Sequence, residues 1–304
     1  MKLYLSSDNL GDAKVEAIKD CHFRYGIEMK FLMSFWFFIR FEKKTKKWTF
    51  SKENKTLESI RRVKNETGLD LKMLLDSGVF SARKKGITLP TELLAEFYHE
   101  YSDIFEYVFS MDEGTIEQQI ENIRILKNEN VPVIGIFHPG SIEKPFMTNK
   151  HLNEIMDITD FISYSDAFIP TAQREKILDN IFNEVYKRGY KGKSHYLGME
   201  SPVWLSQYPF YSADASTYIR NVNLGEIFQF DQKNWHGLKK INIKRNMREL
   251  VRTDINYCKC QDRIEKIEGE WTGPDVRTYY NILNRAIYQK FLTDLWSKRG
   301  VTWN

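Results

Sequence analysis

The chain has few cysteines and no long hydrophobic run, and these two absences exclude whole classes of protein. Its 304 residues include only Cys21, Cys258 and Cys260, which are too few and too unevenly spaced for a disulfide framework. The longest apolar stretch, FLMSFWFFI at 31–39, is about half the length of a membrane-spanning helix. The sequence therefore predicts a protein of a reducing cytoplasm that does not span a membrane.

The sequence also lacks a signal-peptide core, because charged residues interrupt the apolar ones throughout the first thirty positions. It contains no internal repeat, low-complexity tract or Gly/Ser-rich linker. The formal net charge is +4, a mild basic excess that favours polyanionic partners but that many ordinary enzymes share. One catalytic domain with a short appendix is the simplest organisation that fits.

Short apolar runs alternate with amphipathic stretches such as 115–130 and 171–190, whose apolar residues recur at helical spacing. This alternation is typical of a parallel sheet covered by helices. Eight such runs predict an α/β fold, a (β/α)8 TIM-like barrel, with a doubly wound sheet as the alternative. The eight runs are 2–7, 28–38, 71–78, 104–112, 131–140, 161–167, 193–200 and 209–215.

Two regions depart from the repeating pattern. Residues 40–58 form a polar, basic excursion between the second expected strand and its helix. Helical periodicity dominates the C-terminal region, where Pro274 suits a first helical turn and Gly300 suits a helix end. We therefore expect a catalytic barrel over 1–237 and a helical extension, packed on the barrel, over 238–304.

Six of the eight expected strands end on a titratable residue. Active sites of such barrels lie at the carboxyl ends of their strands. A single Asp after a strand is ordinarily a helix cap or turn residue. Six on one rim repel one another unless a ligand, a metal or a reaction uses them. In chain order these residues are Asp76, Asp112, His138, Asp166, Glu200 and Asp214.

This residue set favours chemistry that depends on carboxylates. No G-x-S-x-G motif is present, and Cys21 belongs to the first expected helix, away from the strand ends. Two carboxylates suffice to break a glycosidic bond, one attacking the anomeric carbon and the other protonating the leaving group. Asp214 and Asp76 are the candidate pair. A carboxylate-dependent glycosidase and a metal-dependent hydrolase using Asp76, Asp112 and His138 remain alternatives, as does an inactive binding module.

Five segments together resemble the active-site segments of a known enzyme family. They are LLDSGVFS at 74–81, FSMDEG at 109–114, GIFHPG at 135–140, HYLGMESP at 195–202 and YSADAS at 211–216. In this order they resemble the segments that build the active site of tRNA-guanine transglycosylases. They are most similar to the short phage-type relatives that place 7-deazaguanines in DNA. The similarity covers roughly residues 70–220 and follows successive strand ends of the expected barrel.

The resemblance implies a role for each matching residue. Asp214 would be the nucleophile, Asp76 the general acid and base, and Asp112 the residue that binds the Watson–Crick edge of a guanine-like base. A carboxylate can accept the two hydrogen bonds which that edge donates. His138 stands where the family usually has Gln, and SYSDAF replaces a glycine-rich turn. The resemblance places four further residues around the base, Ser77, His138, Asp166 and Leu197.

The resemblance also implies partners and cofactors. The tRNA enzymes carry a structural zinc held by three Cys and one His, but here Cys258 and Cys260 stand alone and no His follows His236. We therefore expect no cofactor. The expected partners are DNA, or alternatively tRNA, and a free base such as 7-cyano-7-deazaguanine. For a phage-encoded relative the location would be the host cytoplasm.

Basic residues near the expected rim are candidates for contacts with the phosphate backbone. Two groups stand out in the sequence, one within the polar excursion and one directly after the D-S-G turn. A solvated loop face is the alternative for both groups. The candidate residues are Lys46, Lys47, Arg83, Lys84 and Lys85.

Overall fold

The computed structural model describes residues 1–7, 9–69, 71–144, 146–165, 169–230, 238–242 and 270–303. The chain divides into two compact units. The first, which we call the barrel unit, comprises Met1–Asn9, Lys30–Ala215 and Trp303–Asn304, and the second comprises Leu10–Met29 and Ser216–Thr302. The predicted domains are consecutive in the sequence, whereas the second unit also includes a segment from near the N-terminus. The packing of the extension on the barrel stays a prediction.

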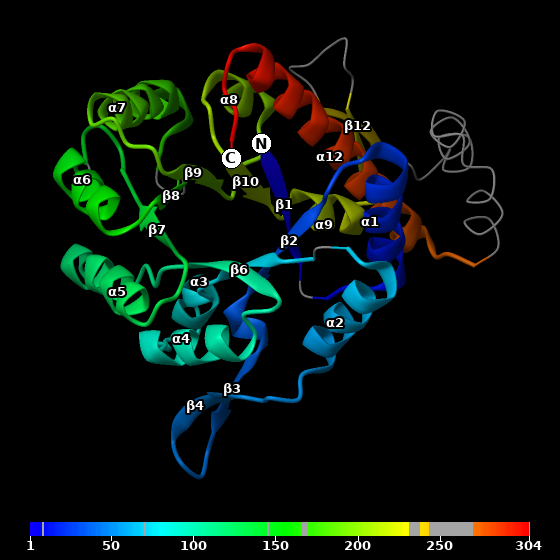
Figure 1. The fold of residues 1–304 in the computed structure, drawn as a ribbon, viewed down its shortest axis with the longest axis horizontal. Helices are drawn as coiled ribbons and strands as arrows, with labels where there is room; N and C mark the ends of the chain where they lie inside the picture. Colours follow the sequence, from blue (N-terminus) through cyan, green and yellow to red (C-terminus); the bar gives the residue numbers. More distant parts are fainter. Residues whose placement is uncertain are drawn as a thin grey trace. The chain divides into compact units, whose positions relative to one another are not determined.

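Eight parallel strands form a closed barrel, which confirms the predicted fold class (Figure 1). Each predicted apolar run contains one of these strands. The strands follow one another around the barrel in chain order, and the eighth pairs with the first, so that Tyr4 lies opposite Asp214. They are β1 (Lys2–Ser7), β2 (Lys30–Ser34), β5 (Met73–Asp76), β6 (Phe105–Phe109), β7 (Val133–Phe137), β8 (Phe161–Ser165), β9 (Lys193–Leu197) and β10 (Ser212–Ala215).

Helices connect the strands and cover the sheet with their apolar faces. Thr115 begins α5 with a capping box, in which its hydroxyl accepts from the Gln118 amide while the Gln118 side chain accepts from the Thr115 amide. Asn54 caps α2 in a related way. The helices of the barrel unit are α2 (Lys55–Thr67), α3 (Val79–Arg83), α4 (Thr91–Glu100), α5 (Ile116–Asn128), α6 (Asn149–Ile158), α7 (Arg174–Lys187) and α8 (Pro202–Gln207).

The predicted excursion between β2 and α2 is a short 3-10 turn, η1 (Phe35–Phe37), followed by a hairpin of β3 (Ile39–Glu42) and β4 (Lys47–Phe50). Phe41 pairs with Trp48 and Ile39 with Phe50 across this hairpin, so all four apolar side chains share one face. Phe50 packs edge-on against Phe97 of α4 with ring centroids 5.2 Å apart. The hairpin is therefore anchored at its base by aromatic contacts.

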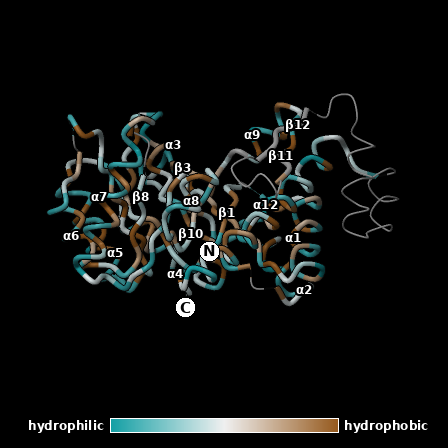
Figure 2. Tube along the Cα trace, turned by 90° about the horizontal axis from the view of Figure 1, so that it is seen from above, coloured by the Kyte–Doolittle hydropathy of each residue, from teal (hydrophilic) through white to brown (hydrophobic). Residues whose placement is uncertain are grey.

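An apolar cluster fills the barrel interior. Side chains from most of the strands meet there, as expected for a barrel whose centre is a packed core rather than a pore. Figure 2 shows hydrophobic segments along the strands of this unit. The buried members are Tyr4, Leu32, Leu74, Phe109, Ile134, Ile136, Phe161 and Tyr211, with Tyr107, Leu197 and Trp303 packed against them.

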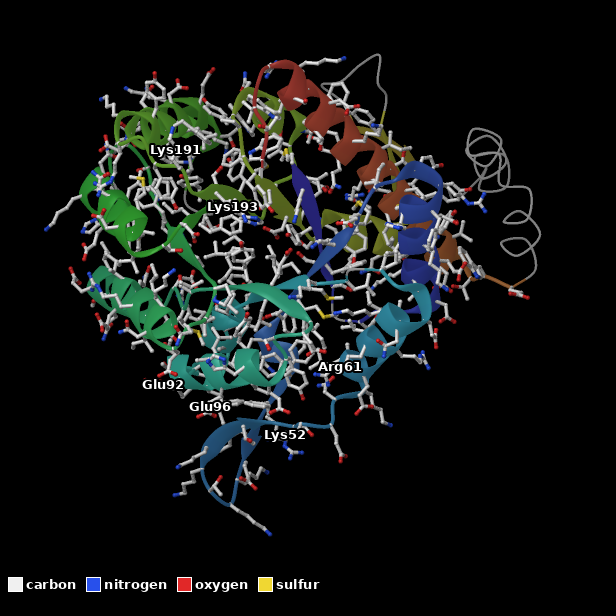
Figure 3. All side chains as sticks on the ribbon, in the orientation of Figure 1. Lys52, Arg61, Glu92, Glu96, Lys191 and Lys193 are labelled. Carbon is white, nitrogen blue, oxygen red and sulfur yellow. The ribbon has the colours of Figure 1, made fainter. Side chains whose placement is uncertain are left out.

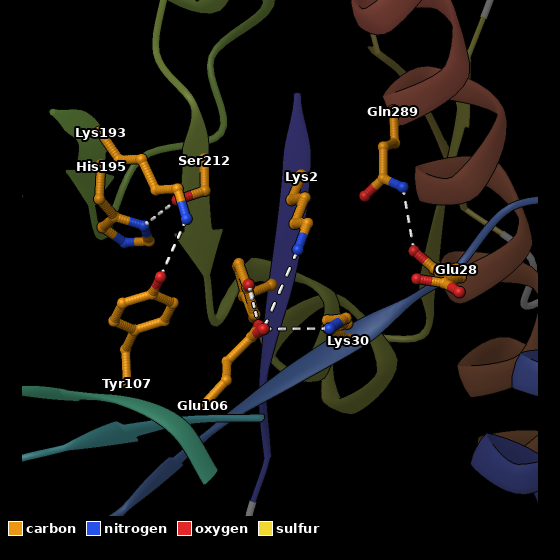
Figure 4. A network of polar contacts seen from close by, with 10 residues as sticks. Lys2, Glu28, Lys30, Glu106, Tyr107, Lys193, His195, Ser212 and Gln289 are labelled. Carbon is orange, nitrogen blue, oxygen red and sulfur yellow. Dashed lines mark hydrogen bonds and ion pairs between the residues drawn. The ribbon is translucent and has the colours of Figure 1, made fainter. Parts of the chain in front are cut away.

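A charged layer lies at the amino-terminal ends of the strands (Figure 4). The Glu106 carboxylate accepts hydrogen bonds from the Tyr4 hydroxyl and from Nζ of Lys30, the latter at 3.2 Å. Nζ of Lys2 lies 4.0 Å from the same carboxylate. Because Lys30 is almost fully buried, this pairing satisfies a charge that would otherwise be costly inside the barrel.

Lys193 is the fourth charged member of this layer. Its Nζ donates a hydrogen bond of 2.9 Å to the Tyr107 hydroxyl. The same ammonium lies 4.9 Å from the ring centre of Tyr211, 5.1 Å from that of Tyr107 and 6.0 Å from that of Phe161. These cation–π contacts hold the ammonium among aromatic rings. Figure 3 labels Lys193 within the ring of strands and Lys191 outside it.

The second unit contains α1 (Asp12–Tyr25), α9 (Thr217–Asn223), β11 (Glu226–Phe230), β12 (Leu238–Asn242) and α12 (Gly273–Lys298). The Tyr279 hydroxyl of α12 donates to Asp20 of α1 at 2.6 Å, and Gln289 donates to the Glu28 carbonyl at 3.0 Å (Figure 4). Helix α12 confirms the helix predicted from Pro274. None of the described helices is long and apolar enough to cross a membrane.

Candidate active site

Asp76 is the last residue of β5, at the carboxyl end of the barrel. Burial removes water from its carboxyl group and raises its pKa to about 6 from an ordinary value of 3.8. The negative charges of Asp112 and Asp214 raise it further, while the Ser34 hydroxyl and the Gly78 amide lower it. The charges of Asp112 and Asp214 are therefore near enough to Asp76 to influence its ionisation.

The D-S-G turn fixes the position of Asp76. Its Oδ2 accepts a hydrogen bond of 3.1 Å from the backbone N–H of Gly78, while Ser77 is buried. Gly78 has a φ of 76°, and a β-carbon built on it would lie 2.7 Å from the backbone nitrogen of Trp36. Only glycine satisfies both the left-handed backbone and this close approach. The turn therefore ties the carboxylate to the segment that follows β2.

Asp214 lies in β10 with its side chain almost fully buried. Its Oδ1 accepts the backbone N–H of Gly198 at 2.7 Å and lies 3.0 Å from Nε2 of His195. Its Oδ2 accepts one longer hydrogen bond, 3.3 Å, from the Ser6 hydroxyl. The two oxygens are therefore unequal. Oδ1 is held by two short contacts, whereas Oδ2 is the more available to react.

His195 is a candidate functional residue that the sequence analysis missed. Its ring is completely buried, and its Nδ1 lies 2.8 Å from the Ser212 hydroxyl (Figure 4). A carboxylate at Asp214 accepts from Nε2–H, so the neutral tautomer leaves Nδ1 to accept from Ser212. Alternation along β9 could have indicated His195, since it shares a strand face with Leu197, two residues away.

Asp112 and His138 form a second pair at the same rim. Nε2 of His138 lies 3.0 Å from Oδ2 of Asp112, and Nη2 of Arg83 donates to the Asp112 main-chain carbonyl at 2.9 Å. The His138 side chain is 7% exposed and that of Asp112 is 23% exposed. The imidazole is thus placed to orient a carboxylate that remains open to a ligand.

The other predicted site residues are placed as follows. Leu197 is half-buried against the apolar cluster, and Glu200 is half-buried two residues beyond Gly198. Asp166 lies outside the described residues, as do the predicted remnants of a zinc site at Cys258 and Cys260. Among the described residues, no three His, Cys, Asp or Glu side chains are grouped so as to hold a metal ion. The candidate phosphate-binding side chains, which are all exposed, are Lys46, Lys47, Arg83, Lys84 and Lys85.

Two carboxylates at this rim occupy contrasting environments. Asp214 is surrounded by hydrogen-bond donors, which stabilise a carboxylate, whereas burial shifts Asp76 toward its protonated form. A nucleophilic carboxylate that works with a general acid needs a partner carboxyl group with a raised pKa, and Asp76 meets that requirement. The geometry therefore suits a reaction that needs one nucleophilic and one proton-carrying carboxyl group.

Comparisons with known proteins support the fold alone. No family model matches the sequence, and no curated protein matches it. The YdjI aldolase of Escherichia coli K12 is similar in structure with a TM-score of 0.52 at 8% identity, over 96% of this chain and 90% of that one. A protein of Coccidioides immitis assigned as a fructose-1,6-bisphosphate aldolase has a TM-score of 0.54 at 10% identity, over 98% and 93%. Unrelated reactions share this barrel.

Proposed function

We propose that this chain is an enzyme, a nucleic-acid guanine transglycosylase that exchanges guanine for a 7-deazaguanine in DNA through a covalent intermediate on Asp214. The observation that carries the proposal is the presence of two different carboxyl groups on one rim. Asp214 accepts hydrogen bonds from Gly198 and His195, whereas burial raises the pKa of Asp76. The five sequence segments that resemble the transglycosylases contribute both of these residues, which strengthens the proposal. Such a pair can act on a C1′–N9 bond in two steps.

In the first step, Oδ2 of Asp214 attacks C1′ of the target nucleotide while the C1′–N9 bond breaks. The bonding electrons leave with guanine, and Asp76 supplies the proton that neutralises it. Oδ2 is the suitable oxygen because Oδ1 is occupied by Gly198 and His195. The product is a glycosyl ester of Asp214, formed with inversion at C1′.

In the second step, the ionised Asp76 removes the N9 proton of the incoming 7-deazaguanine. N9 then attacks C1′, the ester bond breaks, and its electrons return to Asp214 as a carboxylate. Two inversions give overall retention, as expected for a covalent mechanism. A pKa of about 6 suits this alternation, since Asp76 must donate a proton in one step and accept one in the next.

Asp112 and His138 are the candidates for recognition of the base. A carboxylate accepts both N1–H and the exocyclic amine of a guanine-type face. His138 holds Oδ2 of Asp112 at 3.0 Å, which fixes the orientation of the carboxyl group before the base arrives. The imidazole thereby contributes through Asp112 rather than by direct contact with the base.

DNA is the proposed polymer because the five segments are most similar to those of the relatives that act on DNA. Lys84, Lys85 and Arg83 lie directly after the D-S-G turn, where they can hold a short stretch of phosphate backbone. The target nucleotide must leave the duplex for its C1′ to reach a buried carboxylate. We therefore expect the fastest exchange on single-stranded or mismatched guanines. Recognition of tRNA is the alternative that the experiment must distinguish.

The test is incorporation of labelled guanine into single-stranded DNA, mismatched DNA, matched duplex and tRNA at several salt concentrations. Exchange into DNA that falls steeply as salt rises supports the proposal. Labelling of tRNA with none in DNA would show that the chain acts like the tRNA-guanine transglycosylases rather than like their DNA-modifying relatives. No labelling of either polymer, with no trapped protein–nucleic-acid ester, would overturn the proposed function altogether.

A further inference from the structure

Five aromatic side chains gather on η1, the β3–β4 hairpin and α3. Three of them are unusually exposed for such large apolar groups, with Phe80 69% exposed, Phe37 56% and Phe41 47%. Trp36 and Trp48 lie among them and are half-buried. We call Trp36, Phe37, Phe41, Trp48 and Phe80 the aromatic platform. Exposed apolar groups that cluster in this way mark an interaction surface more often than scattered ones do.

Three rings of the platform form a continuous series. The ring centroids of Phe41 and Trp48 are 5.3 Å apart, and those of Trp48 and Trp36 are 5.8 Å apart. The same face of the hairpin is fixed at its base by the packing of Phe50 on Phe97. The rings therefore stand on an anchored element, which lowers the entropy lost when a ligand stacks on them.

The platform adjoins the proposed catalytic rim. Gly78, two residues after Asp76, lies so close to the Trp36 backbone that no larger residue would fit at position 78. Helix α3, which carries Phe80, begins directly after Gly78. A nucleic-acid strand whose target nucleotide reaches Asp76 would therefore pass over Trp36 and Phe80 with its neighbouring nucleotides.

Positive charges lie beside two of the rings. Nζ of Lys84 lies 4.1 Å from the ring centre of Phe80, and Nζ of Lys85 lies 5.3 Å from that of Trp36. Both lysines are exposed, so each offers an ammonium group to a phosphate while its neighbouring ring offers a face to a base. Two of the five rings thus have a lysine beside them, whereas lysine is depleted on surfaces that bind an ordinary protein partner.

We propose that the aromatic platform binds unpaired nucleotides that flank the target, with bases stacked on its rings and phosphates held by Lys84 and Lys85. The occupant is a single-stranded segment of nucleic acid. The proposal rests on the proposed function for the position of the target nucleotide, but binding itself needs no reaction. Rings that stack with every base, together with lysines that follow the backbone, are the combination expected of a single-strand site without base readout.

The test uses the full chain and a fluorescein-labelled oligothymidylate, which contains no guanine to exchange. Fluorescence anisotropy should show about tenfold weaker binding for Phe80→Ala and a larger loss for Phe37→Ala combined with Phe80→Ala. Tyr186→Ala is the matched control, since Tyr186 is 86% exposed on α7 outside the platform. Thermal melting of each variant checks that the fold is retained.

A second arm tests the lysines through salt dependence. Replacing Lys84 and Lys85 with Ala should lower the slope of log K against log salt by about 0.7 for each phosphate that a lysine no longer neutralises. The exposed Lys191 serves as the control, and Lys191→Ala should leave the slope unchanged. Binding of matched duplex should be weaker than binding of the single strand, because paired bases offer no free faces for stacking.

The outcomes separate this proposal from the proposed function. If the folded Phe37→Ala/Phe80→Ala variant binds oligothymidylate as tightly as the wild type, the platform proposal is wrong, even if guanine exchange persists. Duplex bound as tightly as single strand overturns it as well, and so does capture of a protein partner without any oligothymidylate binding. Loss of single-strand binding in the ring variants supports the platform, even if no guanine exchange is detected.

Discussion

The backbone amide of Gly198 and the imidazole of His195 meet on one oxygen of Asp214, at 2.7 and 3.0 Å. Both residues belong to the segment HYLGMESP, so a single stretch of chain determines which carboxylate oxygen is held and which is left to react. Gly198 has a φ of 73°, a conformation that aims its N–H at the carboxylate and that other residues rarely adopt. Asp214, the proposed nucleophile, is thus oriented by the segment that contains the end of the neighbouring strand β9.

Asp214→Asn should abolish both guanine exchange and the covalent adduct, because an amide cannot supply an anionic nucleophile. The adduct can be trapped by denaturing the protein during turnover and detected by mass spectrometry. Glu96→Gln, on the exposed surface of α4 (Figure 3), is the matched control and should behave as the wild type. Near-normal exchange by the Asp214 variant would show that another group attacks the sugar.

His195→Leu should lower kcat by roughly tenfold to over a hundredfold with little effect on KM, because a charge-assisted hydrogen bond is worth about 1.5–3 kcal/mol. His195 is a positioning residue, so His195→Gln, which can still donate to Oδ1 of Asp214, should recover part of the rate. A purely structural role would instead predict equal loss of stability in both variants and no recovery. Steady-state kinetics and urea unfolding measure the two effects separately.

Asp76→Asn should stabilise the protein at pH 8 while slowing exchange severely. The pKa of Asp76 is about 6 in the folded protein and 3.8 ordinarily. The carboxyl group therefore favours folding most below pH 4, and this contribution is lost as pH rises through 6. Above that, its ionisation costs about 1–3 kcal/mol. Urea unfolding at pH 4 and pH 8 should show a gain for the variant at pH 8 alone.

The rate of adduct formation should fall as pH rises above about 6. The first step needs Asp76 protonated, and its raised pKa places the loss of that proton near this value. Rapid-quench measurement of the glycosyl ester between pH 5 and pH 8.5 isolates this step from the second. An ester-formation rate that is flat across this range would remove Asp76 from the role of general acid.

Asp112→Ala should weaken binding of 7-cyano-7-deazaguanine by about tenfold to over a hundredfold, since one charge-assisted contact contributes roughly 1.5–3 kcal/mol. Isothermal titration of the free base measures this affinity without any nucleic acid. The expected change in unfolding free energy is smaller, because the Asp112 side chain is partly exposed. Unchanged affinity would place the base elsewhere on the rim.

The barrel could be predicted from the sequence because its strands are short apolar runs with helical segments between them. Asp76 and Asp214 could be identified because each closes such a run. Alternation along β9 can place the His195 side chain on the same face as Leu197, but it cannot show that His195 contacts Ser212 and Asp214, which lie 17 and 19 positions further along the chain. Their proximity depends on the register of β9 against β10. The aromatic platform could not be predicted either, because it combines side chains that precede α2 in the sequence with Phe80, which follows α2.

The pairing of Glu106 with Lys30 could not be predicted for a related reason. Both residues lie in strands that are otherwise apolar, and they are separated by 76 positions. In a pattern of hydrophobic runs, Glu106 and Lys30 are only charged interruptions, and nothing indicates that the charge of one neutralises the charge of the other. Only closure of the barrel, which brings the starts of β2 and β6 together across its interior, makes their charges a stable pair.

The charged layer of Glu106, Lys2, Lys30 and Lys193, together with the apolar cluster, closes the end of the barrel interior that lies opposite the rim. In the proposed exchange, both the departing and the incoming base would then pass through the rim. The guanine released in the first step of the proposed reaction would therefore compete directly with the incoming 7-deazaguanine. Turnover would follow a ping-pong scheme, in which excess guanine drives the modification backwards and a supply of the alternative base determines how far it proceeds.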